Sequence, residues 1–137
     1  MAVVEELIRK ESDGTISFGN YALKVKSKVS DFEHQGDLYK VKTFNEITKL
    51  EKNGMFIYES VPGTAVFHMD TKDSNVSFEV TGNDTAQITL ELEAEKEYEI
   101  YKNNNFLGQM KTNLGGKLVL SLELGEEEKD IIKVVKL

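Results

Sequence analysis

The sequence contains no cysteine, no tryptophan, one proline and, among its 17 basic residues, a single arginine. The absence of cysteine excludes disulfide frameworks, thiolate metal sites and cysteine nucleophiles. With Arg9 as its only arginine, the chain has almost none of the forked side chains that grip carboxylates and phosphates. No catalytic or cofactor motif is present either. We therefore expect no cofactor, no bound metal and no enzymatic activity.

A long hydrophobic run is also missing. The first ten residues already carry the charges of Glu5, Glu6, Arg9 and Lys10, where a signal peptide would need an unbroken apolar stretch. No later stretch approaches the roughly 20 apolar residues of a membrane span. We therefore expect a soluble, cytoplasmic protein that does not interact with a membrane.

Positive charge is scarce overall, because the formal net charge is −7 and the isoelectric point is about 4.9. Nucleic-acid binding requires clustered positive charge that displaces counter-ions from phosphates. The lysines here are interleaved with acidic residues along the sequence. We therefore predict that nucleic acid is not a partner.

The sequence is rich in strand and turn patterns. Between residues 98 and 124, leucines at alternate positions from Leu118 to Leu124 give the period-2 pattern of a strand with one buried face. Asn103-Asn104-Asn105 and Gly115-Gly116 interrupt the runs with residues that tolerate a positive φ, as hairpin turns require. Asn53-Gly54 is a similar turn signal. These patterns predict an all-β protein.

The expected strands fall into two groups. In the first half, Asp37–Phe44 has Tyr39, Val41 and Thr43 on one face and lysines on the other, whereas 26–36 is polar and predicted to be a loop. Val3–Arg9 favours a strand over helical turns, and Asn45–Leu50 is compatible with either. The remaining predicted strands are Thr15–Phe18, Tyr21–Val25, Val76–Thr81, Ala86–Leu92, Tyr98–Tyr101, Phe106–Lys111, Lys117–Leu124 and Ile131–Val135.

The even spacing of strands after about residue 70 is typical of an immunoglobulin-like β-sandwich. We therefore predict an N-terminal β-meander over residues 1–63 followed by a sandwich-like module over 64–137. The two parts are expected either as separate units or packed as one.

Two stretches are apolar on both faces, which an ordinary half-exposed strand is not. They belong either to the middle of the core or to a subunit interface. The candidate interface residues are Met55, Phe56, Ile57, Tyr58, Val66, Phe67 and Met69. We favour the interface, and with it a homo-oligomer.

Candidate polar sites are few. Glutamates at every second position from Glu91 to Glu99 suggest either a cation site or, as we prefer, the polar face of a hairpin. His68 lies between apolar residues and is either a buried general base or an outward-facing strand residue, the second being favoured. His34 is a weak candidate metal ligand, for which a loop position without function is preferred. The tyrosines at 39, 58 and 101 are possible platforms for a sugar ring.

Two stretches of the sequence, residues 31–66 and 87–125, resemble a set of short proteins from anaerobic Gram-positive bacteria, some of which carry the label endosialidase. Sialidase-like enzymes hold a carboxylate with an arginine triad, and this chain has only Arg9, so no catalytic residue is transferred. The C-terminal half also resembles small immunoglobulin-like modules attached to carbohydrate-active proteins. The residues that fit that motif are Tyr98, Ile100, Asn104, Gly108, Thr112, Gly116 and Leu118, with Asn105 in place of a glycine.

Together these features predict a bacterial, non-enzymatic binding or assembly protein that associates with itself, with another protein or a glycan as further partners. A carbohydrate-interacting accessory module is the alternative, and a small hydrolase using His68 is the third. All three are expectations from sequence.

Overall fold

The computed structural model describes residues 1–137, which form strands joined by short connections and one 3-10 turn, η1 (Lys72–Ser74). The strands are β1 (Ile8–Lys10), β2 (Ile16–Phe18), β3 (Ser27–His34), β4 (Asp37–Thr43), β5 (Thr48–Lys52), β6 (Met55–Val61), β7 (Ala65–Asp70), β8 (Val76–Thr81), β9 (Thr85–Glu91), β10 (Glu97–Lys102), β11 (Asn105–Lys111), β12 (Lys117–Glu123) and β13 (Asp130–Lys136). The chain is therefore all-β, as the sequence predicts.

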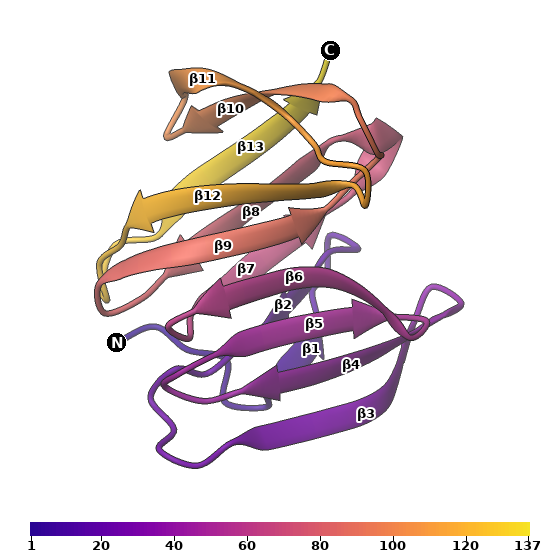
Figure 1. Ribbon diagram of the computed structural model, residues 1–137. Helices are drawn as coiled ribbons and strands as arrows, with labels where there is room; N and C mark the ends of the chain where they lie inside the picture. Colours follow the sequence, from indigo (N-terminus) through magenta and orange to yellow (C-terminus); the bar gives the residue numbers. More distant parts are fainter.

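The strands form two antiparallel sheets that pack face to face as a β-sandwich (Figure 1). Sheet A has seven strands in the order β1-β2-β7-β8-β13-β10-β11, and sheet B has six in the order β12-β9-β6-β5-β4-β3. In the view of Figure 1, sheet B lies in front, with β12 at the top and β3 at the bottom. Strands from residues 1–63 and from 64–137 occur in both sheets, because β2 pairs with β7 and β6 pairs with β9.

The core between the sheets is a single cluster of 22 buried residues. Alternate side chains point into it, as the period-2 pattern of β12 illustrates with Leu118, Leu120 and Leu122, all at most 5 % exposed. At its centre the ring of Tyr58 meets Phe18 and Phe78 edge-on, with centroid distances of 5.2 and 5.8 Å. The core therefore spans both halves of the sequence. The immunoglobulin-like assignment of residues 64–137 stays a prediction.

A chain of buried hydroxyl groups fixes the connection between β6 and β7. Thr64 immediately precedes β7, and its hydroxyl is 2.7 Å from both the Tyr58 hydroxyl and the Ser60 hydroxyl. Its backbone N–H and carbonyl both bond to the hydroxyl of Thr48, which also contacts Thr43 at 2.8 Å. Because each buried polar group has a partner, the network stabilises this corner of the sandwich without an unsatisfied group.

The predicted turns are confirmed. Asn53 and Gly54 have φ values of 52° and 80°, and they connect β5 to β6 in a tight hairpin. Asn103 and Asn104, with φ values of 52° and 68°, do the same between β10 and β11. The strands therefore end at the predicted turns, because glycine and asparagine adopt a positive φ at little energetic cost.

Three predictions for the first half of the chain were wrong. Tyr21–Val25 is a turn and not a strand, because the Asn20 side chain accepts a hydrogen bond from the backbone of Ala22 and bends the chain there. The expected loop at 26–36 contains the eight-residue strand β3. In Val3–Arg9, only the last two residues enter a strand, β1.

A bulge explains why β3 was missed. Val29 and Phe32 both pack against the core, although they are three positions apart, because the register with β4 shifts between them. The bulge removes the period-2 alternation by which a strand is detected. An edge strand of this kind is also polar, which gave the segment the composition of a loop.

Candidate functional site

The seven candidate interface residues divide between interior and surface. Tyr58, Val66, Phe67 and Met69 are buried, with exposed fractions of at most 5 %. Phe56 and Ile57 are half-buried, and Met55 alone is exposed, at 64 %. Most of these apolar residues are therefore buried within a single chain. Burial in the core was the alternative to a subunit interface that the sequence left open.

The N-terminal segment covers the second face of β7. Val4 is completely buried against Phe67 and Tyr21, and Ala2 and Val3 pack at the margin of this small cluster. Its backbone is held by a hydrogen bond from Val4 N–H to the Gly19 carbonyl at 3.0 Å. β7 therefore has apolar residues on both faces because the chain's own N-terminus lies over it.

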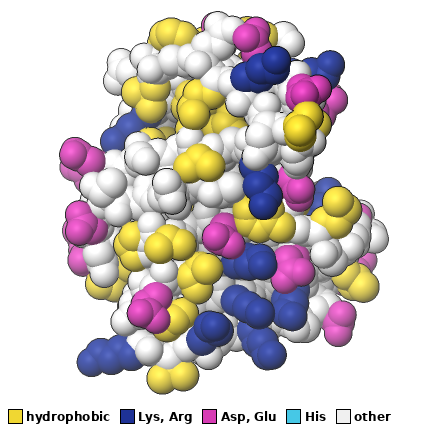
Figure 2. Space-filling model, viewed as in Figure 1, with side chains coloured by type: hydrophobic (Ala, Val, Ile, Leu, Met, Phe, Trp, Pro, Cys, Tyr) yellow, Lys and Arg dark blue, Asp and Glu magenta, His cyan; other side chains and the backbone are white.

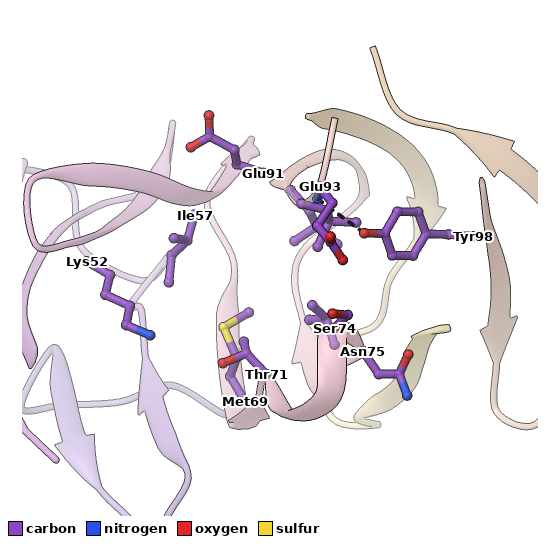
Figure 3. A pocket seen from close by; sticks show the side chains of 12 residues that line it. Lys52, Ile57, Met69, Thr71, Ser74, Asn75, Glu91, Glu93 and Tyr98 are labelled. Atoms are coloured by element: carbon purple, nitrogen blue, oxygen red, sulfur yellow. Dashed lines mark hydrogen bonds between the residues drawn. The ribbon is translucent and has the colours of Figure 1, made fainter. Parts of the chain in front are cut away.

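A cleft opens at one end of the sandwich, between the two sheets (Figure 3). Its volume is about 270 Å³. Met69, Leu90 and Tyr98 form its buried floor, together with the half-buried Ile57 and Leu92. An apolar floor with a few polar groups around it is typical of small-molecule sites.

Polar groups surround this floor. Lys52 and Ile57 approach from sheet B, while Thr71, Ser74 and Asn75 come from the β7–β8 connection on the opposite side (Figure 3). The Tyr98 hydroxyl points towards the β9–β10 connection and accepts a hydrogen bond from the backbone N–H of Glu93 at 3.2 Å. Hydroxyl, amide and carboxylate groups thus converge on one apolar floor.

The charges of the cleft are partly paired. Lys52 Nζ lies 3.5 Å from Asp37 Oδ2, and hydrogen bonding by Asn53 together with Lys52 lowers the pKa of Asp37. Lys136 Nζ lies 2.8 Å from the carboxylate of Glu93, and this hydrogen bond, with a second from Ser74, lowers the pKa of Glu93. Glu91 has no ion-pair partner at the cleft.

The cleft continues on both sides of Lys52 and Ile57, which line two further hollows. The smaller, polar hollow has a volume of about 100 Å³ and includes His34 and Asp37. The larger, of about 510 Å³, includes exposed apolar residues such as Met55. The end of the sandwich is thus a groove with a polar and an apolar side.

A separate hollow, which we call the lateral hollow, lies at one lateral side of the sandwich, where the edge strands β11 and β12 end the two sheets. Its volume is about 190 Å³, and it is bounded by Leu107 and Met110 on β11 and by Val119 on β12. These three side chains are 54, 38 and 41 % exposed. No strand joins β11 to β12, so both sheets end here in an unpaired edge (Figure 1). The core residues behind the hollow, Ile100, Leu120 and Leu122, are at most 5 % exposed.

The opposite lateral side is closed. There β1 lies against β3, and Lys10 places its ammonium 5.9 Å from the ring centre of Phe32 and 4.0 Å from Glu33. β1 has only three residues, and β3 carries charges and a bulge, which are common means of protecting a sheet edge. The β11 edge also contains a bulge, at Leu107, but Phe106 and Leu107 are more than half exposed and no strand of the other sheet packs beside them.

The two histidines lie at different places. His68 is on the outer face of β7, where its Nδ1 is 3.0 Å from Asp13 and 3.2 Å from the Thr15 hydroxyl. It lines neither the end cleft nor the lateral hollow. His34 ends β3 and is buried, with Nε2 2.9 Å from the Gly14 carbonyl, so the expected loop position was wrong. No group of three potential metal ligands occurs in the structure.

The glutamates from Glu91 to Glu99 do not form one ridge. Glu91 ends β9 in sheet B, whereas Glu97 and Glu99 belong to β10 in sheet A. The expected hairpin between these strands was therefore wrong, because the chain crosses from one sheet to the other between residues 92 and 96. The tyrosine platforms are similarly scattered, since Tyr58 and Tyr39 are buried and only Tyr101 is half-exposed.

Sequence reasoning missed both the end cleft and the lateral hollow. Each is formed by residues from strands far apart in the chain, so no local pattern reveals it. The sequence contained one signal for the lateral hollow. The apolar pair Phe106-Leu107 follows a turn, and the strand around it does not alternate between apolar and polar residues. Such a pattern is unusual for a strand that is covered on one face.

The fold and the site define a two-sheet antiparallel β-sandwich with an open end cleft and one open lateral edge. No protein-family model, curated protein or solved structure matches the chain in the comparisons. No helix in the structure is long and apolar enough to span a membrane.

Proposed function

We propose that this chain is a non-enzymatic binding and assembly protein that associates with itself through the lateral edge formed by β11 and β12. The observation that carries the proposal is the exposure of Leu107, Met110 and Val119 around an apolar hollow between two unpaired sheet edges. Burial of such residues in an interface removes apolar surface from water, which favours association. Unprotected edge strands also offer backbone groups for pairing.

The proposal moves the interface away from the stretch that the sequence favoured. Most of Met55–Met69 is unavailable inside the core, whereas every residue of β11 except Gly108 is exposed. A second copy that covers the edge would close the sandwich on its open side, as β1 and β3 do on the other. A dimer with two-fold symmetry, in which the same edge of both copies forms the contact, is the commonest closed oligomer.

The molar mass in solution, measured by light scattering from micromolar to sub-millimolar concentration, tests the proposal. The expected result is an oligomer for the natural chain and a monomer for the Leu107→Lys, Met110→Lys variant, because burying two ammonium groups in an apolar contact is costly. Met55→Lys is the control and is expected to remain oligomeric. A natural chain that is monomeric throughout the range would refute the proposal.

A second candidate function, carbohydrate binding, is favoured by the end cleft. Hydroxyl, amide and carboxylate groups around an apolar floor match the mixed polar and apolar surface of a sugar ring. Thr71, Ser74 and Glu91 are the groups at the rim of the cleft (Figure 3).

Titration of oligosaccharides, followed by amide chemical shifts, tests this second candidate. Shifts around the cleft that are lost in a Ser74→Ala, Glu91→Gln variant would support it. Tyr101→Ala is the control, since Tyr101 lies outside the cleft and packs on Phe106 at the outer surface. Binding that depends on Tyr101 and not on the cleft residues would contradict the cleft as the sugar site.

A further inference from the structure

The outer face of β3, β4 and β5 carries four lysines, which we call the lysine surface: Lys28, Lys40, Lys42 and Lys49. Lys28 lies directly opposite Lys42 across the β3–β4 pair, and Lys42 lies directly opposite Lys49 across the β4–β5 pair. Figure 2, which shows sheet B from outside, displays basic side chains gathered where these three strands lie.

Folding alone does not explain this arrangement. Like charges at directly opposite positions destabilise an antiparallel sheet. None of the four lysines forms an ion pair, although Glu51 and Glu59 occupy the positions opposite Lys40 and Lys49. In a chain with a net charge of −7, a row of three neighbouring lysines is a departure from the average surface. Departures of this kind are expected where a surface has a binding role.

The geometry excludes a small enclosed ligand. The cleft, its two side hollows and the lateral hollow are lined by none of the four lysines. The face is an open sheet surface, so a single anion would meet only flexible, solvated ammonium groups. Appreciable binding therefore requires a partner that contacts several of the lysines at once.

We propose that the lysine surface binds an acidic polypeptide segment, in which carboxylates recur along an extended chain. Lysine provides point charges that pair with an anionic group from any direction, and Arg9, the only arginine, lies on β1 of the other sheet. The four ammonium groups, none of which forms an ion pair, are therefore complementary to a flexible chain of anionic groups.

The spacing of the lysines selects a polypeptide among carboxylate polymers. Lys40 and Lys42 alternate along β4, so their Cα atoms lie roughly 6.6 Å apart, which is also the repeat of alternate side chains in an extended peptide. Acidic side chains at every second position of a segment parallel to β4 therefore meet both lysines. Lys28 and Lys49, on strands about 4.8 Å to either side, contact the segment from its flanks.

Fluorescence anisotropy with labelled poly-L-glutamate at low salt tests the proposal. The expected result is that Lys28→Gln, Lys42→Gln, Lys49→Gln lowers the affinity about tenfold or more, because three ammonium–carboxylate contacts are lost at once. The matched control Lys72→Gln, Lys96→Gln, Lys133→Gln removes the same charge from exposed positions elsewhere and should bind as the natural chain does. Equal affinity of the two triple variants, or no binding by the natural chain, would overturn the proposal.

Two further measurements separate the alternatives. The melting temperature of the lysine-surface variant should equal or exceed that of the natural chain, since repulsion between opposite lysines is removed, so lost binding would not reflect unfolding. Alginate, a carboxylated polysaccharide, and single-stranded DNA should bind more weakly than polyglutamate. Tighter binding of either polymer through the same three lysines would refute an acidic polypeptide as the partner.

Discussion

At the scale of the residue, the turn before β2 contains Asp13, a carboxylate whose pKa is strongly lowered. The Asp13 side chain accepts hydrogen bonds from the hydroxyl and the backbone N–H of Thr15, and these bonds, with the neighbouring His68, lower the pKa of Asp13 to about 2. Nearby, hydrogen bonds from Ser17 and Arg9 lower the pKa of Glu11. The outer side of β2 and β7 is therefore held by ionised carboxylates.

The stability of the protein should depend on pH through Asp13. Its folded-state pKa lies below the ordinary value of 3.8, so its contribution is fully present above that value and is lost as the pH falls towards about 2. In Asp13→Asn, the free energy of unfolding should consequently fall less steeply over this range.

Chemical denaturation at a series of pH values measures this slope. Asp31→Asn is the control, because it removes a similar exposed charge to which no hydrogen bond is made. An unchanged slope in Asp13→Asn would show that the hydrogen bonds from Thr15 do not hold the carboxylate in its ionised form.

At the scale of the element, close approach between connections fixes how β12 begins. Gly116 has a φ of +80°, and a Cβ atom at this position would lie 2.2 Å from the carbonyl oxygen of Leu92. The backbone N–H of Leu92 donates to the Gly116 carbonyl at 2.7 Å, which ties the turn before β12 to the end of β9. This contact sets the position of the strand that borders the lateral hollow.

Gly116→Ala should therefore destabilise the protein more than Gly54→Ala. Gly54 also has a φ of +80°, but a Cβ atom there meets nothing within 4 Å. We expect about 1 kcal/mol for Gly54→Ala, from the left-handed conformation alone. For Gly116→Ala we expect about 3 kcal/mol or more, from that conformation and the backbone shift.

Denaturant titration of the two variants measures the difference. An equal decrease in the free energy of unfolding in both variants would mean that the backbone near Leu92 moves aside without an energetic cost. The contact would then not fix the position of β12.

The strands also show what the sequence could and could not predict. β8 and β12 were located almost to the residue, because their alternation is regular and turn residues bound them. β3 was missed because the bulge between Val29 and Phe32 breaks the period. The lysine surface was partly visible, since Lys40 and Lys42 alternate with Tyr39 and Val41, but its cross-strand row depends on a register that includes the missed strand.

At the scale of the whole molecule, the two ends of the chain contribute to one sandwich. β2 pairs with β7, β6 pairs with β9, and the 22-residue core draws on both sheets. The sites depend on these long-range pairings: the end cleft joins residues from Lys52 to Tyr98, and the lateral hollow joins β10 and β11 to β12. Local patterns contain no information on such pairings, which is why the interface was placed on Met55–Met69.

The central claim is that the β11 edge is the surface through which copies of the chain associate. Amide hydrogen exchange, measured residue by residue at low and at high protein concentration, tests it most directly. We predict that amides of β11 gain protection at high concentration, whereas those of β3, the protected edge strand of sheet B, exchange equally at both. β11 exchange that does not depend on concentration, while the molar mass rises, would place the interface elsewhere and contradict the account.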